Sequence, residues 1–385
     1  MNAFRETGTR SLFRTVTAIV ASAAVFGVVA GVSTSAMAAV DFSGKRIAVI
    51  IPFSEGGGTD SYSRFMAPYF EKYLPGNPKI VIINRPGGGG LTGVNYYAAK
   101  ASTEGTWVLA LSTSSQSNYM LGDKRAKFDM ADFIPIILSP RGVTQYVRND
   151  LGIQNEPTLK AKIEKLRSYP QSKLIFGGKT PTSGGLALRT ALTLLGIEVT
   201  SVWGLGGNGP MALAFERGEF TMSYDNTLSF LNNRSHMIKS GMAVPLYTFG
   251  VINEDGSISR DPALPNIPTF DEAYKAVHGK APSGTAYEAW RSLMAVSVPL
   301  SKSWNLMRGT PPEVIKVWRE AARKVYAEVM RSPKGQKIFG PYKNIMTDAA
   351  IKIRDQGTTL DPKAADWLAS YVDERYNIKI VAKTK

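Results

Sequence analysis

The chain has 385 residues, a formal net charge of +15 and no cysteine. The lack of cysteine excludes disulfides, a lipid-anchoring cysteine, thiol catalysis and cysteine-ligated metals. Lysine and arginine are spread along the whole chain, without an arginine-rich run or a nucleic-acid-reading motif. The charge therefore predicts a diffuse surface field that attracts anions, and no nucleic-acid partner.

Residues 1–38 have the pattern of a secretory signal peptide. Three arginines precede an apolar run at residues 16–32, and the segment ends in the small residues Ala36 and Ala38. The alternative is a retained membrane anchor, but polar residues and glycines interrupt the run. We therefore expect cleavage after Ala38 and a periplasmic protein, exported by the general route because no arginine pair precedes the apolar run.

Strand and helix patterns alternate after the signal, which is typical of α/β domains with largely parallel sheets. The first series predicts strands at 46–52, 79–84 and 106–112, and helices at 59–74 and 91–101. A similar series restarts near Leu174, with strands at 174–177, 199–203, 220–224 and 244–249. Extended patterns at 134–139 and 145–148 lie between the two series, and helices at 312–330 and 362–376 come last.

The two series predict two domains, because the chain after the signal exceeds what one core usually supports. We expect the chain to cross near Arg141 and to return near 261–268, where three prolines deny regular structure. Domain 1 would comprise residues 39–141 and 262–385, and domain 2 residues 142–261. A chain that crosses twice makes a hinge with a cleft.

Four loops share one design, in which an apolar strand runs into a glycine-rich turn that opens a helix. They span residues 52–60, 84–93, 177–185 and 204–209. The first N–H groups of a helix lack internal partners and lie at the positive end of its dipole, so such loops favour anions. The alternative for each loop is a tight turn with only a capping role for these side chains: Thr59 or Asp60, Thr92, Ser183 and Asn208.

Signals for nucleotides and for catalysis are weak. Glycine patterns at 88–93 and 204–209 match the dinucleotide fingerprint but lack its strand-end acid, and Gly178-Lys179-Thr180 lacks the first glycine of a phosphate loop. His236 and His278 are interpreted as structural or surface residues without metal-ligand spacing. No catalytic residue, metal or cofactor is therefore predicted.

Several motifs recur in the order of one known family. They are Pro52-Phe53 with Gly57 and Asp60, Asn84-Arg85-Pro86-Gly87 with Gly89-Gly90 and Gly93, Arg217-Gly218-Glu219, residues 222–226, residues 264–269 and residues 309–313. At these positions the chain resembles the substrate-binding receptors of tripartite tricarboxylate transporters, the Bug family. The resemblance implies a two-domain periplasmic binding protein fold of the α/β class, in which mostly parallel sheets flanked by helices close on a carboxylate in the cleft between domains.

The resemblance also implies a function and a site. The protein would deliver a small organic carboxylate to a permease with large and small integral-membrane subunits, and would itself be a monomer without enzymatic activity. The ligand-binding residues that the motifs imply are Phe53, Gly57, Thr59, Asp60, Gly90, Thr92 and Asp225. The residue pattern itself, apart from the resemblance, adds Thr113, Thr180, Thr182, Ser183 and Asn208.

Alternatives and departures stay open at this point. The protein could present its ligand to a membrane sensor, or be an α/β enzyme with a glycine-loop phosphate or nucleotide site. Glu55 stands where the family usually has a small residue, and its charge opposes a carboxylate unless it points away. Because hydroxyls and glycine N–H groups dominate the loops, we expect neutral donors to hold the ligand. The sequence leaves open which carboxylate that is.

Overall fold

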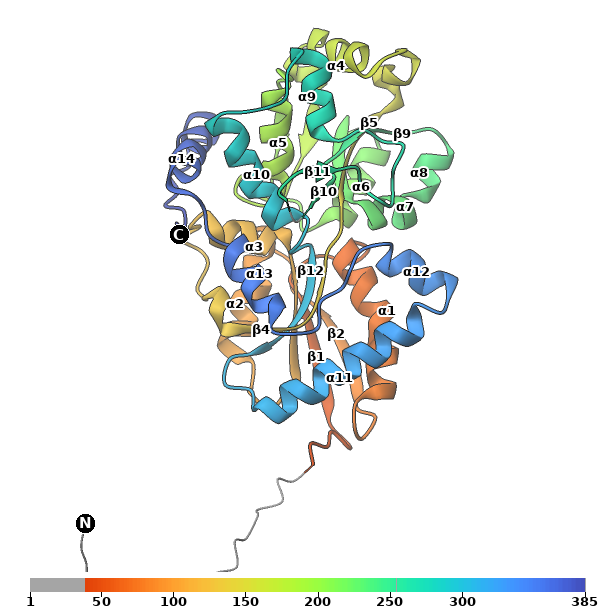
Figure 1. Ribbon diagram of the computed structural model, residues 1–385, viewed down its shortest axis with the longest axis vertical. Coiled ribbons are helices and arrows are strands. Elements are labelled where there is room, and N and C mark those ends of the chain that lie inside the picture. The colour runs from red at the N-terminus through yellow and green to blue at the C-terminus, as the bar shows by residue number, and fades with distance from the viewer. Residues whose placement is uncertain (1–38, 254, 385) are drawn as a thin grey trace, which may run out of the picture. The chain divides into compact units, whose positions relative to one another are not determined.

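The computed structural model describes residues 39–253 and 255–384, so the predicted signal peptide lies outside the described residues. Two five-stranded sheets organise this part of the chain, in the orders β2-β1-β3-β12-β4 and β7-β6-β8-β5-β9. Figure 1 labels β1, β2, β4 and β12 of the first sheet and β5 and β9 of the second. The first sheet contains β1 (Arg46–Ile51), β2 (Lys79–Asn84), β3 (Trp107–Ser112), β4 (Phe133–Ser139) and β12 (Lys302–Met307). The second contains β5 (Val143–Arg148), β6 (Ile175–Gly177), β7 (Thr200–Val202), β8 (Met222–Asn226) and β9 (Ala243–Thr248).

Each sheet is mostly parallel, with one reversed strand. In the first sheet β1 is parallel to β2 and β3, whereas β12 is antiparallel to both of its neighbours, β3 and β4. In the second sheet β6 is parallel to β7 and β8, and β5 is antiparallel to β8 and β9. Four strands of each sheet therefore run in one direction, as predicted, and a single strand in each runs the other way. A small hairpin of β10 (Val251–Ile252) and β11 (Ile258–Ser259) stands apart.

Helices cover the first sheet on both faces. They are α1 (Gly58–Tyr73), α2 (Leu91–Lys100), α3 (Thr113–Met120), α11 (Pro312–Val329), α12 (Pro333–Phe339) and α13 (Ala349–Gly357). Alternate residues of a strand point to opposite faces, and β1 follows this rule: Val49 belongs to the core with α1 and α11, and Ile50 to the core with α2. The apolar run of β1 is thus explained by burial on both faces.

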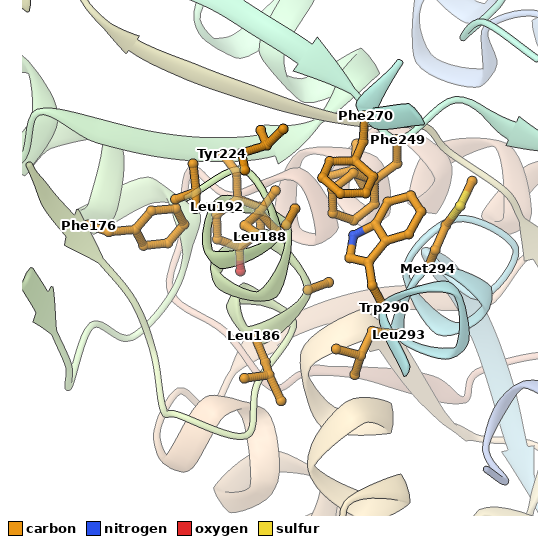
Figure 2. Close-up of a cluster of buried hydrophobic side chains, with 14 of the residues drawn as sticks. Phe176, Leu186, Leu188, Leu192, Tyr224, Phe249, Phe270, Trp290, Leu293 and Met294 are labelled. Carbon is orange, nitrogen blue, oxygen red and sulfur yellow. The ribbon is translucent and has the colours of Figure 1, made fainter. Parts of the chain in front are cut away.

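The second sheet packs against α4 (Leu159–Ser168), α5 (Gly185–Leu194), α6 (Asn208–Glu216), α7 (Thr227–Asn233), α8 (Ser235–Lys239), α9 (Phe270–His278), α10 (Thr285–Ser297) and α14 (Pro362–Tyr376). Its largest core joins α5, α9, α10 and α14. Figure 2 shows part of this core, with residues of α5, α9 and α10 labelled. Trp290 of α10 is fully buried there, with its ring centroid 4.2 Å from that of Phe270. Phe176 of β6, Leu186 of α5 and Val298 at the end of α10 belong to the same core.

The chain leaves the first sheet after β4 and enters the second at β5, so Arg141 lies in the predicted crossing. The next strand of the first sheet is β12, which begins at Lys302. Before it, α9 contacts α4 and β9, whereas α10 contacts both α5 and α14 of the second sheet and α3 and α13 of the first. The exact limits of the two domains stay a prediction.

Among the described residues, none of the helices combines the length and the apolar character needed to cross a bilayer.

Candidate ligand-binding site

A cavity lies between the two sheets, where the carboxyl ends of their parallel strands face each other. Residues at or just beyond the ends of β1, β3, β6 and β8 line it, together with the first residues of the reversed strands β5 and β12. The lining residues are Phe53, Gly57, Gly58, Thr59, Ser112, Thr113, Ser114, Val143, Lys179, Gly184, Leu188, Asn208, Tyr224, Asn226, Ser297, Ser301 and Lys302. Open α/β sheets bind ligands in this position.

The cavity is small. Its volume is about 50 Å³, and one buried water needs roughly 10–15 Å³ by such a measure. The space therefore suits a few water molecules or a short organic acid, and a nucleotide does not fit it.

Two helices of the first sheet begin at this cavity. The N-cap residues are Gly57 for α1 and Ser112 for α3, and neither makes a side-chain capping hydrogen bond. The first N–H groups of both helices therefore lack a capping partner from the N-cap side chain, and the positive end of each helix dipole lies at the cavity. Thr59 and Thr113 bring hydroxyls to the same place.

Two helices of the second sheet repeat this arrangement. Gly184 is the N-cap of α5 and Gly207 that of α6, again without a side-chain capping bond. Asn208, the first residue of α6, lines the cavity, and its amide donates to the carbonyl of Tyr224 at 2.7 Å. Four helix N-termini thus converge on one cavity, two from each sheet, which is an environment for an anion.

Two buried lysines add full charges to this environment. Lys179 follows β6, and its ammonium donates to the hydroxyl of Tyr224 at 3.0 Å. Lys302 begins β12, and its ammonium donates to the hydroxyl of Ser112 at 3.1 Å and to the carbonyl of Ser301 at 3.0 Å. Burial, together with the nearby charges of Arg141 and Lys179, lowers the pKa of Lys302 from 10.5 to about 7. From the sequence we expected mainly neutral donors, so these two ammonium groups add charged donors to the site.

Five of the predicted site residues line the cavity: Phe53, Gly57, Thr59, Thr113 and Asn208. The other seven do not, and each has a different place in the structure. They are Asp60, Gly90, Thr92, Thr180, Thr182, Ser183 and Asp225. Their role in binding stays a prediction, and their contacts are described next.

The two predicted aspartates hold the loops around the cavity. Asp60 is buried, pairs with Arg64 at 2.9 Å and accepts a hydrogen bond from the amide of Asn84 at 3.0 Å. This contact joins the first loop to the end of β2. Asp225 is buried beside Arg234, with Nε and Oδ2 3.0 Å apart, and accepts from Asn208 at 3.1 Å. Asp225 therefore orients a side chain of the cavity without lining it.

The predicted hydroxyls of the third loop join the two sides of the cavity. Thr180 and Thr182 donate to Oδ1 of Asn118 on α3, at 3.1 and 2.8 Å. The amide of Asn118 in turn donates to the carbonyl of Gly89 in the second loop at 3.2 Å. Ser183 bonds locally to the carbonyl of Thr180. Asn118 is fully buried and thus connects a loop of the first sheet with a loop of the second.

The second glycine loop packs against Phe53, which lines the cavity. Gly90 has a φ of 101°, and a Cβ there would lie 2.8 Å from the ring of Phe53, so only glycine allows this ring to pack against the loop. Thr92 is exposed and does not line the cavity. Arg85 is also exposed and outside the lining, and its guanidinium stacks on the ring of Tyr96. The role of Thr92 in binding therefore stays a prediction.

Glu55 points away from the cavity. Its side chain is 76% exposed and pairs with Arg64 at 3.3 Å. The charge that departs from the family pattern therefore does not oppose an anion in the cavity.

The histidines lie at the surface, as interpreted from the sequence. His236 on α8 contacts Glu216, and His278 is the last residue of α9, beside the carbonyl of Leu194. Within residues 39–253 and 255–384, no group of three or more histidines or acids is arranged to hold a metal ion.

Sequence reasoning missed the lining residues that come from β12 and α3. Lys302, Ser301 and Ser114 belong to segments for which no strand or helix was expected. Residues 302–306 are all buried, but the polar Lys302, Ser303 and Asn305 interrupt the apolar run that would have marked a buried strand. Lys179 lies in Gly178-Lys179-Thr180, an incomplete phosphate-loop motif, and the sequence alone gave it no role in binding.

Comparisons with known proteins agree with this architecture. No protein-family model matches the chain. A protein of Pseudomonas sp. (strain P51), described as a UPF0065 protein in the tcbD-tcbE intergenic region, is 24% identical over 244 residues, which are 63% of this chain and 67% of that protein.

Solved structures are similar over most of the chain. The periplasmic binding protein BugD superposes with a TM-score of 0.62 at 19% identity and covers 87% of this chain and 98% of its own. MatC of Rhodopseudomonas palustris, solved with bound malate, has a TM-score of 0.62 at 18% identity over 83% of this chain and 98% of its own. Another R. palustris protein, solved with adipate, has a TM-score of 0.62 at 20% identity over 88% of this chain and 99% of its own.

The chain therefore has the two-domain α/β fold of periplasmic binding proteins, as predicted. Its resemblance to the Bug and TctC proteins, inferred from the glycine-loop motifs, is confirmed at the level of the fold.

Proposed function

We propose that this protein is a periplasmic solute-binding protein that captures a small organic carboxylate in the cavity between its two sheets. It would deliver this ligand to a permease with large and small integral-membrane subunits, and would act as a monomer without catalysing a reaction. We also propose export to the periplasm with cleavage after Ala38, and two domains formed by residues 39–141 with 262–385 and by residues 142–261.

The observation that carries this proposal is the convergence of four helix N-termini, none capped by its N-cap side chain, on one small cavity. The helices are α1, α3, α5 and α6. Each helix end favours a negative group by roughly 0.3–1 kcal/mol, so the four ends together contribute roughly 1–4 kcal/mol toward binding a small anion. Carboxylates in two similar folds, MatC with malate and an R. palustris protein with adipate, agree with this ligand class.

The cavity also argues against the alternative of a nucleotide-dependent enzyme. Its volume of about 50 Å³ is too small for a nucleotide. No pair of histidines and acids lines it, since the titratable side chains of the lining are Lys179, Tyr224 and Lys302.

A thermal-shift screen of the mature protein tests the proposal. The screen would include mono-, di- and tricarboxylates, aromatic acids and nucleotides, each followed by calorimetric titration where the midpoint moves. A carboxylate at about 100 times its dissociation constant should stabilise the protein by roughly 2.7 kcal/mol. Stabilisation by nucleotides alone, or by none of these compounds, would contradict the proposal.

A further inference from the structure

The cavity contains one buried lysine from each of its two sides. Lys179 belongs to the loop after β6 of the second sheet, and Lys302 is the first residue of β12 in the first sheet. Both lysines line the cavity, and each is only 5% exposed. Lysines are rarely buried to this extent unless they are paired.

Neutral groups are the hydrogen-bond partners of both ammonium groups: the hydroxyl of Tyr224 for Lys179, and the hydroxyl of Ser112 with the carbonyl of Ser301 for Lys302. In the described part of the chain, no carboxylate oxygen lies within 4.0 Å of the ammonium nitrogen of either lysine, so neither forms an ion pair. A buried cation without a counterion is unfavourable. An anion bound in the cavity would remove this cost.

The other charges around Lys302 do not neutralise it. Arg141, which lies between β4 and β5, is buried and donates to the carbonyls of Pro140 and Ile338. Asp225 at the end of β8 is the acid that faces Lys302, but Arg234 pairs with it directly. Tyr62 of α1, which lines an adjoining pocket with Lys302, is a phenol bonded to Ser139 of β4, and its pKa is raised by burial. The surroundings of Lys302 are therefore cationic on balance.

We propose that Lys179 and Lys302 are the charge partners of a ligand with two carboxylates, each lysine binding one carboxylate from its own side of the cavity. This inference rests on the proposed function and specifies its ligand. A dicarboxylate that contacts both lysines bridges the two sheets, so charge neutralisation and closure of the cavity occur together. A monocarboxylate leaves one ammonium buried without a counterion and binds more weakly.

The first experiment compares acids of equal length on the mature wild-type protein by calorimetric titration. The pairs are succinate with butyrate, glutarate with valerate, and adipate with hexanoate, because the small cavity suits short chains. A hydrogen bond to a charged group contributes about 1.5–3 kcal/mol, so the preferred dicarboxylate should bind about 10- to 100-fold more tightly than its monocarboxylate partner.

The second experiment removes each charge by substitution. Lys179→Met and Lys302→Met should each weaken dicarboxylate binding about 10- to 100-fold and reduce the preference over the monocarboxylate. Lys72→Met is the matched control, because Lys72 is exposed on α1 and pairs with Glu328 outside the cavity. This variant should bind as the wild type does. The comparison of acids needs no variant, so it decides the matter even if a substitution prevents folding.

The outcomes separate the two proposals. Equal affinity for the paired acids, or unchanged dicarboxylate binding in both lysine variants, overturns the role of the lysines but leaves a carboxylate-binding protein. Binding of none of the acids, with a correctly folded protein, overturns both. Selective dicarboxylate binding that is lost in the lysine variants and kept in Lys72→Met supports both.

Discussion

Replacing Lys302 with methionine should stabilise the ligand-free protein while it weakens ligand binding. Methionine has a similar length and no charge, so the variant keeps most of the packing of this buried side chain and removes its ammonium. The pKa of Lys302 falls from 10.5 to about 7 on burial. Since one pKa unit corresponds to about 1.4 kcal/mol, the buried ammonium costs up to about 5 kcal/mol of folding free energy.

The pH dependence of this effect has a definite sign. The pKa in the folded protein, about 7, lies below the 10.5 of an ordinary lysine. Below pH 7 both states carry the proton, so the cost of burial is complete. Between pH 7 and 10.5 the folded protein releases the proton while the unfolded chain keeps it, and the cost falls by about 1.4 kcal/mol for each pH unit.

Chemical denaturation of the mature wild type and of Lys302→Met, at pH 6, 7, 8 and 9 without ligand, measures the difference. The midpoint of the variant should lie above that of the wild type at pH 6, and the gap should narrow above pH 7. Lys72→Met, at an exposed position, serves as the control and should show no such trend. A variant that is less stable than the wild type at every pH would refute the reasoning.

Four further predictions concern the same site. Thr182→Val removes the 2.8 Å hydrogen bond to Asn118 that joins the two sides of the cavity, and it should weaken ligand binding about 3- to 10-fold in calorimetric titration. Thr190→Val is the control, because it loses only a hydrogen bond within α5 and should leave the affinity unchanged. Asp225→Ala leaves a buried arginine uncompensated and should lower the unfolding free energy by about 3–5 kcal/mol in denaturant titrations. Glu55→Gln should leave carboxylate affinity unchanged in calorimetry, since this side chain is exposed. At pH 8, Lys302 should take up a proton when the ligand binds, because a bound carboxylate raises the lowered pKa of this lysine. Calorimetry in two buffers of different ionisation enthalpy measures the uptake, and equal binding enthalpies in both buffers would contradict the prediction.

Much of the fold follows from local patterns in the sequence. The strand at residues 46–52 was predictable because its apolar run is buried on both faces, and the glycine loops marked where the helices begin. The reversed strand β12 was missed, although Lys302–Met307 pairs with two neighbours. Its buried Lys302 and Asn305 hide the usual apolar signal, because polar residues at this strand serve the cavity and its hydrogen bonds.

The candidate site was predictable in kind and less so in detail. A glycine loop with hydroxyls shows that polar groups gather at a strand end, but the sequence does not tell whether a hydroxyl faces a ligand or another loop. Thr180 and Thr182 bond to Asn118, which lies 62 and 64 residues away along the chain. Such contacts depend on how the two sheets approach each other. Local pattern carries no information about that approach.

The most direct test of the account is a crystal structure of the mature protein with the dicarboxylate that binds most tightly in titration. We expect the ligand in the cavity between the two sheets, with one carboxylate about 2.7–2.9 Å from Nζ of Lys302 and the other at a similar distance from Nζ of Lys179. A ligand bound outside this cavity, or one that contacts neither lysine, would contradict it.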